Sequence, residues 1–338
     1  MRVRGADTQW CRVRKMKITV IVCTYNRCKS LPTTLDSIAR QRFEEPVEWE
    51  VLVVDNNSND QTRQVVEEFS RRYTGRFRYL FEPRQGLSQA RNAGIEAARG
   101  DILAFTDDDV TFEPGWLQSL TSDLETGEWA GAGGRILRRW TCAVPKWLSF
   151  QGPYERMSFP IFTFDKGEAQ GQLDDFAAGA NMAYRKEVFQ KYGTFRTDLG
   201  RRGNVLLAGE EVEFARRLRS AGERLRYEPL AVVYHPVEEY QVSKDYFLKF
   251  WFNAGRSGAR IASTQPVWGI PRRYLRVARM IFSLPTKVLG WTLSLTPHRR
   301  FYYKVQVWEI AGGLAECIQQ WRDAMGPALT HVGGADEA

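Results

Sequence analysis

Short apolar runs alternate with amphipathic segments through the first 110 residues of the chain. Four of these runs are rich in Val, Ile, Leu and Phe and end at polar residues, as strands buried on both faces of a sheet do. They cover residues 18–23, 49–54, 77–81 and 102–105. The segments between them carry apolar residues at helical spacing, which predicts a parallel sheet with right-handed crossover helices.

The helix boundaries are marked as well. Ser30 and Ser88 are predicted N-caps, Pro32 falls in the first turn of one helix, and Gly100 follows the end of another. The pattern therefore predicts an α/β fold, a Rossmann-like and mostly parallel sheet with helices on both faces. A helical segment is expected to follow this sheet at the C-terminal end.

Three of the predicted strands end in polar loops, at residues 24–27, 55–60 and 107–109. The carboxyl ends of parallel strands share one rim, where open α/β sheets bind their ligands. The adjacent carboxylates of Asp107, Asp108 and Asp109 repel one another, and a divalent cation with oxygen ligands would offset that repulsion. A solvated acidic turn is the alternative interpretation, because so short a motif often occurs by chance.

The same rim offers the groups that a nucleotide requires. Tyr25 can form a wall for the base, Asp55 can accept from the ribose or from ring N–H groups, and the acids can hold a cation for the phosphates. No GxGxxG motif follows the first strand, and no GxxxxGK[ST] motif occurs. A dinucleotide-binding fold and a P-loop are therefore not expected.

A second kind of region follows residue 240. Between residues 244 and 304 the chain has twelve Lys and Arg, against Asp245 and, just beyond, Glu309, so this excess of +10 exceeds the net charge of +8 of the whole chain. The segment alternates aromatic and basic residues with helical character. It resembles an interfacial anchor for an anionic membrane, with Trp251 or Trp291 at the headgroups.

Three alternatives remain for this basic region. Its helices can pair into a homodimer, or pack back on the core with a solvated basic face. Binding to nucleic acid is the third, but no nucleic-acid-binding motif accompanies the charge, so no such partner is expected. The expected division of the chain is a leader at residues 1–16, a catalytic domain at 17–240, the basic helical region at 241–325, and a tail at 326–338. The leader is expected to be either a start-site artefact or a disordered basic arm.

Compartment and topology follow from simpler features. The five cysteines are an odd number without a CxxC pair, which favours a reducing compartment over a disulfide framework. The first 17 residues lack a signal-peptide pattern, and no uncharged apolar run reaches the roughly 18–20 residues of a membrane span. We therefore expect a cytoplasmic protein, peripheral on the inner face of the plasma membrane if the basic region binds lipid.

Two further segments contribute candidate side chains. Residues 140–171 are rich in aromatics without a clear period, and they either stack on acceptor sugars or pack under a long loop. Residues 210–221 form a predicted helix. At about 100° per residue, Glu211 falls on the apolar face with Phe214 and Leu218, whereas Glu213 falls on the polar face. An acid on the apolar face at the first helical turn is a candidate general base.

Several motifs occur in an order that resembles glycosyltransferase family 2, the inverting enzymes with the A-type glycosyltransferase (GT-A) fold. The resemblance spans roughly residues 17–240. The matching motifs lie at residues 22–27, 53–58, 86–94, 107–109, 179–181, 209–211 and 234–236. Each motif alone is weak, but the ordered set is specific.

The resemblance implies a role for each matched residue. The nucleotide would be bound by residues of the first three motifs and of the acidic motif, namely Thr24, Tyr25, Asn26, Arg27, Asp55, Asn57, Arg91, Asp107 and Asp108. Asp109 would ligate a divalent metal, Mn²⁺ or Mg²⁺, with His235 as a third ligand. Glu211 would be the base, with Glu210 as second choice, because the family usually has Glu-Asp where this chain has Glu-Glu.

Fewer residues of the sequence indicate where the acceptor binds. Asn181 is expected to line the acceptor side, and Asp175, next to Asp174, is expected to face the same cleft, although both fit a turn as well. The activity that the resemblance implies is inverting transfer of a hexose-type sugar from a nucleotide-diphosphate sugar, with UDP favoured, to a glycan or lipid-linked acceptor. Such an enzyme would serve polysaccharide or glycoconjugate synthesis. A sugar nucleotidyltransferase and an inactive sugar-nucleotide or glycan-binding module are the alternatives.

Overall fold

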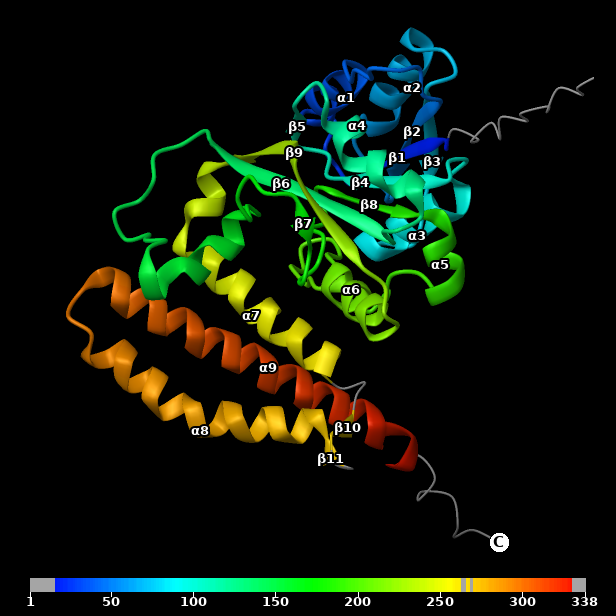
Figure 1. Cartoon of the computed structure of the whole chain (residues 1–338). Coiled ribbons are helices and arrows are strands. Elements are labelled where there is room, and N and C mark those ends of the chain that lie inside the picture. Colours follow the sequence, from blue (N-terminus) through cyan, green and yellow to red (C-terminus); the bar gives the residue numbers. More distant parts are fainter. Residues whose placement is uncertain (1–15, 263–265, 268–269, 330–338) are drawn as a thin grey trace, which may run out of the picture.

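The four predicted strands form one half of a central sheet. The structure, a computed structural model, describes residues 16–262, 266–267 and 270–329. The strands are β1 (Ile18–Thr24), β2 (Trp49–Asp55), β3 (Phe77–Phe81) and β4 (Ile102–Thr106). They pair in parallel in the order β3-β2-β1-β4, which confirms the predicted arrangement (Figure 1).

The other half of the sheet is mixed, which the apolar pattern did not predict. Next to β4 lies β8 (Met182–Arg185), antiparallel to both β4 and β6 (Gly131–Trp140). β6 in turn runs parallel to β9 (Leu225–Val237). The short strands β5 (Thr111–Phe112) and β7 (Gly171–Gln172) pair antiparallel with β9. The α/β class is confirmed, and the antiparallel strand β8 joins the two halves of the sheet.

Helices cover this sheet with their apolar stripes turned inward. They are α1 (Leu31–Ala39), α2 (Thr62–Arg72), α3 (Leu87–Ala97), α4 (Trp116–Thr121), the 3₁₀ helix η1 (Ser122–Thr126), α5 (Lys186–Tyr192) and α6 (Glu210–Ser220). The predicted cap at Ser88 is wrong, because α3 begins at Leu87 and its N-cap residue is Gly86. Ser88 lies inside the helix, where its hydroxyl donates to the carbonyl of Leu199 at 2.9 Å. That bond ties α3 to the loop before α6.

The C-terminal region consists of three long helices. After η3 (Glu239–Val242) come α7 (Lys244–Ala262), α8 (Arg272–Leu293) and α9 (Pro297–Leu329), with the short strands β10 (Pro266–Val267) and β11 (Ile270–Pro271) before α8. α9 packs between α7 and α8, which leaves α8 as the outermost element (Figure 1). The helical region thus continues past the expected limit at residue 325. Residues 1–15 of the expected leader and 330–338 of the expected tail lie outside the described residues.

Residues 140–171 pack against these helices. The segment contains the 3₁₀ helix η2 (Gly152–Ile161), and the ring of Trp147 makes edge contacts with Phe247 and Phe301 at 5.2 and 4.6 Å. Packing is thus the role of Trp147. Trp251 is 4% exposed in the same apolar cluster, so its expected place at lipid headgroups is wrong. No helix in the part of the chain that the structure describes is long and apolar enough to cross a membrane.

Candidate active site

The rim of the sheet brings the three predicted loops together. β1 lies between β2 and β4, and the register pairs Thr24 with Asp55 and Val22 with Thr106. The loops after these strands therefore start at nearly the same level and face one another. This placement follows from the pattern, because parallel neighbours must end on the same side of a sheet.

Hydrogen bonds join the first two loops into one platform. The backbone N–H of Asn26 donates to Ser58 Oγ, and the N–H of Asn59 donates to Asn26 Oδ1, both at 2.9 Å. Asn26 and Asn57 adopt positive φ angles of 53° and 65°, a conformation that asparagine tolerates better than most residues. Tyr25 is 38% exposed on this platform. Its ring is accessible to form the wall for a base that the sequence predicts.

Asp55 lies lower in the platform. Its carboxylate is buried and accepts hydrogen bonds from the Tyr79 hydroxyl at 2.8 Å and from the N–H of Ser58 at 2.9 Å. Each carboxylate oxygen can accept more than one hydrogen bond, so these two contacts orient the group without saturating it. Thr24 is buried beside it at the end of β1, and its carbonyl accepts from the N–H of Asn56.

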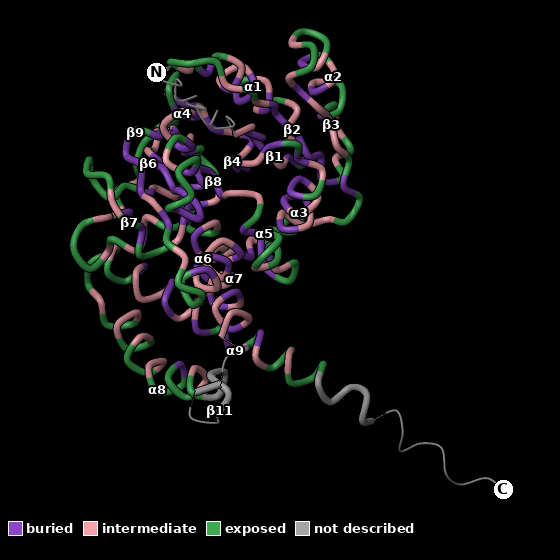
Figure 2. The backbone as a smooth tube through the Cα atoms, turned by 45° about the vertical axis from the view of Figure 1, so that its right-hand side comes forward, coloured by how far each residue is buried: buried purple, intermediate pink, exposed green. Residues whose placement is uncertain are grey.

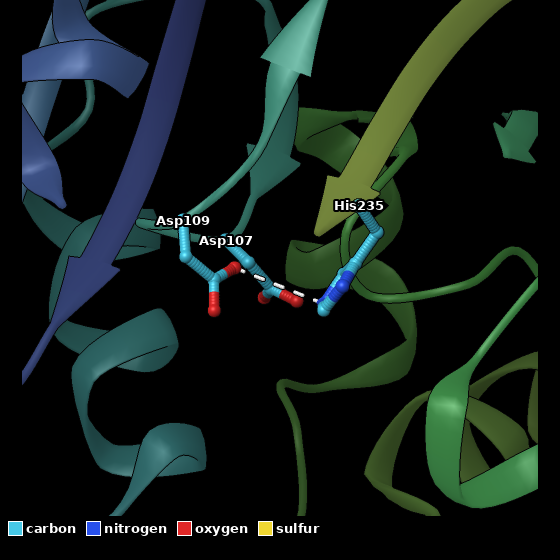
Figure 3. A group of neighbouring side chains, drawn as sticks. All are labelled: Asp107, Asp109 and His235. Carbon is cyan, nitrogen blue, oxygen red and sulfur yellow. Dashed lines mark ion pairs between the residues drawn. The ribbon is translucent and has the colours of Figure 1, made fainter. Parts of the chain in front are cut away.

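Two acids of the triple-aspartate motif converge with a histidine from the far half of the sheet. Figure 3 shows Asp107, Asp109 and His235 pointing toward one another, and one ligand atom from each lies within 4.8 Å of the others. His235 comes from β9, whose partner β5 follows the triple-aspartate turn. The histidine is therefore delivered by a pairing of strands that are far apart in the sequence.

The geometry of His235 and Asp109 fits a metal ion. Nδ1 of His235 lies 2.9 Å from the carbonyl of Pro236, and a proton assigned to Nδ1 leaves the Nε2 lone pair facing Asp109 Oδ1 at 3.7 Å. Metal-bound histidines typically donate their other N–H to such a carbonyl. Oδ1 of Asp109 is buried, and no hydrogen-bond donor within the described ranges reaches it. A divalent cation between these atoms would satisfy both.

The third acid and Arg27 complete the charge balance at the rim. Asp108 is buried, and burial together with the charge of Asp109 raises the pKa of Asp108 to about 7. Arg27 Nη2 lies 3.8 Å from Asp109 Oδ2. Burial opposes the charge of Arg27, but Asp108 and Asp109 raise its pKa above the usual value. Arg27 is therefore a permanent cation beside the acids.

Arg91 occupies a different place from the one expected. Its guanidinium is buried beneath the rim, hydrogen-bonded to Glu210 and 3.9 Å from Asp107. Burial alone would lower the pKa of Arg91, but the charges of Glu210 and Asp107 raise it. The prediction that Arg91 faces the nucleotide is not supported by this position. The residue acts as a buried counter-ion that links α3 to the first turn of α6.

The neighbouring acids of α6 therefore differ sharply. Glu210 is 3% exposed and neutralised by Arg91, so it is poorly suited to take a proton from a substrate. Glu211 is half-buried and has no arginine partner, and the Oε2 atoms of Glu210 and Glu211 both lack a hydrogen-bond partner in the described chain. Burial and the negative charge of Glu210 raise the pKa of Glu211 to about 8. Glu213 forms a partly buried ion pair with Arg217, four residues later in the same helix.

The two predicted acceptor residues lie apart. Asn181 is fully buried: it accepts from Trp116 Nε1 and donates to the carbonyls of Arg135 and Ala231. A Cβ at Gly134 would approach its amide to 2.4 Å, so glycine makes room for it. The expectation that Asn181 lines the acceptor side is wrong, because its side chain braces β6 and β9. Asp175 is exposed and bonds Lys166 beside a hollow of about 200 Å³.

Sequence reasoning missed two residues near the acids. Arg201, in the loop before α6, interacts electrostatically with Asp107 and Asp109. Tyr240, in η3, is 48% exposed and interacts with Arg27. Neither residue belongs to a periodic pattern, and only the adjacent Arg201-Arg202 pair gave a signal. Both come from segments that the tertiary fold carries to the rim.

The sequence of this chain is similar to those of known proteins. A profile described as "Glycosyl transferase family 2" matches residues 19–193. Glucosyl-dolichyl phosphate glucuronosyltransferase of Haloferax volcanii is 30% identical over 244 residues, which are 70% of this chain and 75% of that protein. Succinoglycan biosynthesis protein ExoM of Rhizobium meliloti is 28% identical over 247 residues, which are 73% and 75% of the two chains.

Solved structures share the fold. Mannosyltransferase PcManGT from Pyrobaculum calidifontis, in complex with GDP-Man and Mn²⁺, aligns with a TM-score of 0.60 at 19% identity, over 91% of this chain and 88% of that one. GalNAc-T7 with UDP, GalNAc and Mn²⁺ aligns with a TM-score of 0.55 at 14% identity, over 91% and 57% of the two chains. At these identities the likeness concerns the fold alone.

Proposed function

Because the chain belongs to glycosyl transferase family 2, we propose that it is a metal-dependent enzyme that transfers a sugar with inversion to an acceptor hydroxyl. It is a glycosyltransferase of polysaccharide or glycoconjugate synthesis, with a GT-A fold and a nucleotide-sugar donor. The observation that carries the proposal is the cluster of Asp107, Asp109 and His235, in which Asp109 Oδ1 is buried without a hydrogen-bond partner among the described residues.

The proposed metal site consists of Asp109 and His235, with Asp107 at its edge. The ion is Mn²⁺ or Mg²⁺, and two similar structures were solved with Mn²⁺. Carboxylate oxygens suit either ion, and an imidazole ligand favours Mn²⁺ over Mg²⁺. When bound, the cation would act as a Lewis acid on the donor diphosphate.

The donor is proposed to lie across the platform of the first two loops. Tyr25 is exposed for stacking on the base, and Asp55 keeps acceptor capacity for the ribose or for ring N–H groups. Thr24, Asn26 and Asn57 shape the backbone of this platform. A UDP-sugar is the favoured donor, and a panel that includes GDP-sugars tests this choice.

The donor phosphates need a positively charged side chain, and Arg91 is buried against Glu210. Arg27 lies at the rim beside Asp109, and Arg201 interacts with the same acids from the opposite loop. These two side chains are proposed to receive the diphosphate as its negative charge grows. Asp108, buried behind Asp109, is proposed to shape the site and not to contact the nucleotide directly.

Glu211 is proposed to be the general base. Its unpaired Oε2 takes the proton of the acceptor hydroxyl, and the hydroxyl oxygen bonds to the anomeric carbon. The bond from that carbon to the phosphate oxygen breaks on the opposite side, and the nucleoside diphosphate leaves with the electron pair. A pKa of about 8 suits this role, because a base works best when its pKa is near the working pH.

The acceptor is proposed to be a glycan or a lipid-linked saccharide, and a relative named for a dolichyl phosphate substrate supports the second. Asp175 is kept as an acceptor-side residue because it is exposed beside a hollow. Family membership favours sugar transfer over the sugar nucleotidyltransferase alternative. A catalytically inactive binding module would bind donor without turnover, and an assay distinguishes it.

A thermal-shift experiment tests the metal site. Wild-type protein is heated with UDP or GDP, with and without Mn²⁺, since a ligand bound to the folded state raises the melting temperature by mass action. We expect Mn²⁺ to enlarge the nucleotide-induced shift, and Asp109→Ala to abolish that increase. Asp36→Ala, which removes a surface ion pair with Arg72, is the control and should keep it. An unchanged Mn²⁺ effect in Asp109→Ala would contradict the proposal.

A further inference from the structure

The outermost helix, α8, presents large apolar side chains to solvent. Phe282 is 83% exposed, Leu293 67%, and Leu295, just past the helix, 98%. We call this surface the α8 face, and its apolar members are Leu275, Ile281, Phe282, Leu289, Leu293 and Leu295. Figure 2 shows α8 as a largely exposed element at the edge of the molecule. Single exposed apolar residues are ordinary, but such a row along one helix is not.

Helical geometry explains why no described element covers these side chains. Phe282, Leu289 and Leu293 are spaced by seven and four residues, which places them in one stripe roughly 16 Å long at 1.5 Å per residue. The opposite side of α8 packs on α9, where Met280 meets Gly313 and Trp291 contacts Trp308 at 5.7 Å. Among the described residues, α8 is therefore packed on one side and uncovered on the other, which is the pattern of an amphipathic helix that binds a second partner.

The charges around the α8 face are of one sign. No Asp or Glu occurs between residues 246 and 308, whereas eleven Lys and Arg do. Arg279, Arg299 and Arg300 are exposed on α8 and at the start of α9. A surface that suits this combination must be apolar in its interior and negatively charged at its boundary. An anionic lipid bilayer has both properties.

We propose that the α8 face binds an anionic membrane, with α8 parallel to the bilayer plane and its apolar stripe below the headgroups. A second copy of the chain suits the surface less well, because pairing two α8 faces would bring like charges together without any acid to offset them. Nucleic acid would match the charge but not the apolar stripe. The proposal concerns the surface only and holds for any donor or acceptor.

Docking through α8 would also set the height of the active site above the membrane. Ser257 Oγ of α7 accepts from the N–H of Ala208 at 3.0 Å, and Arg260 Nη1 donates to the carbonyl of Asp198 at 2.6 Å. Glu316 of α9 accepts from Arg256 and Arg260. The helices that carry α8 are therefore hydrogen-bonded to the loop that leads into α6. A membrane-bound α8 would therefore hold the loop before α6 at a fixed orientation relative to the membrane.

Vesicle flotation tests the proposal with the whole chain. Wild-type protein is mixed with phosphatidylcholine vesicles, with and without phosphatidylglycerol, and the protein that floats is measured. We expect flotation with the anionic vesicles, and at least about a tenfold lower partition coefficient for Phe282→Ser/Leu289→Ser, since each substitution removes a large apolar side chain from the lipid. Arg299→Gln/Arg300→Gln should lower it several-fold, and added salt should weaken wild-type binding in the same direction.

Matched controls separate this surface from apolar exposure elsewhere. Phe81→Ser/Leu230→Ser removes two exposed apolar side chains from β3 and β9 and should float as wild type does. All variants should keep the wild-type nucleotide-induced thermal shift, so a failure of the membrane proposal is distinguishable from a failure of the catalytic one. Wild-type protein that floats equally with neutral and anionic vesicles, or with neither, overturns the proposal. The proposal is also overturned if light scattering shows that the wild-type protein is a dimer and that Phe282→Ser/Leu289→Ser makes it a monomer.

Discussion

The rim of the sheet and the α8 face both leave groups without the partner that physical chemistry requires, but the groups are of opposite kinds. At the rim, carboxylate oxygens of Asp109 and Glu211 are buried without a donor among the described residues. On α8, Phe282 and Leu293 are exposed, and no described element covers them. Buried unpaired oxygen indicates a small, charged ligand, whereas an exposed apolar row indicates an extended surface.

The two regions also differ in the environment of an arginine side chain. Arg91 is buried at the rim, where two acids fix its position, whereas Arg279 lies exposed on α8 in a stretch that contains no acid. A buried arginine is part of the folded structure, and an exposed one is available to a partner. Arg91 therefore has a structural role, unlike Arg27 at the same rim, whereas Arg279 is available to a binding partner.

The largest expected effect comes from Glu211→Gln. The variant keeps the shape of the side chain but cannot accept a proton, so transfer or donor hydrolysis should fall by about 10²–10⁴-fold while nucleotide binding persists. Glu213→Gln on the same helix is the control and should be close to wild type. Turnover that survives Glu211→Gln would assign the base to Glu210 instead.

Arg91→Met should have the next largest effect, on stability. It leaves Glu210 buried without its counter-ion, which typically costs about 3–5 kcal/mol in unfolding free energy. Arg279→Met, on the α8 face, should change that free energy by less than about 0.5 kcal/mol. Urea denaturation measures both. Equal effects of the two substitutions would remove the distinction between the regions.

A smaller effect depends on pH. Between the usual glutamate pKa of 4.5 and the raised value of about 8, the folded chain holds the Glu211 proton that the unfolded chain has released. The contribution of this group to stability is therefore present at low pH and declines as pH rises through this window. Glu211→Gln should melt a few degrees above wild type at pH 8, with a smaller difference at pH 5. Wild-type turnover should rise as pH approaches 8, because only the ionised carboxylate can take the acceptor proton.

The smallest expected effect belongs to Phe282→Ser in the absence of vesicles. A side chain that is 83% exposed contributes little to folding, so the unfolding free energy should change by less than about 0.5 kcal/mol. Phe105→Ala, in the core, should cost about 3–5 kcal/mol. A loss above about 2 kcal/mol for Phe282→Ser would mean that the α8 face is packed within the protein and not available to a membrane.

Local pattern explains how much of the site the sequence could predict. Continuous apolar runs identified β1 to β4 within a residue, and their parallel order follows from the crossover helices. Helical periodicity alone separated Glu211 on the apolar face of α6 from Glu213 on the polar face. The reversal of β8 was not predictable in this way, because a four-residue strand has too few positions to define a period.

The misplaced residues share one cause. Arg91, Asn181 and Trp251 are polar or amphipathic side chains that the sequence assigned to a ligand or a membrane, and each is buried. Their partners lie on other elements of the fold. They are Glu210 for Arg91, the carbonyls of Arg135 and Ala231 for Asn181, and the apolar cluster around Phe247 and Phe301 for Trp251. A polar residue is satisfied equally by a substrate or by a distant part of its own chain, and sequence does not distinguish the two.

The sequence by itself determined the class of sheet, the rim where acids gather and the family of the chain, because each depends on short-range order. The tertiary structure alone decided which charges at that rim cancel. It brought His235 to Asp109, turned Arg91 toward Glu210, and left the outer side of α8 bare. Burial and pairing between distant segments set the strength of electrostatic and apolar interactions. Residues that are adjacent in the sequence determine neither the burial nor the pairing.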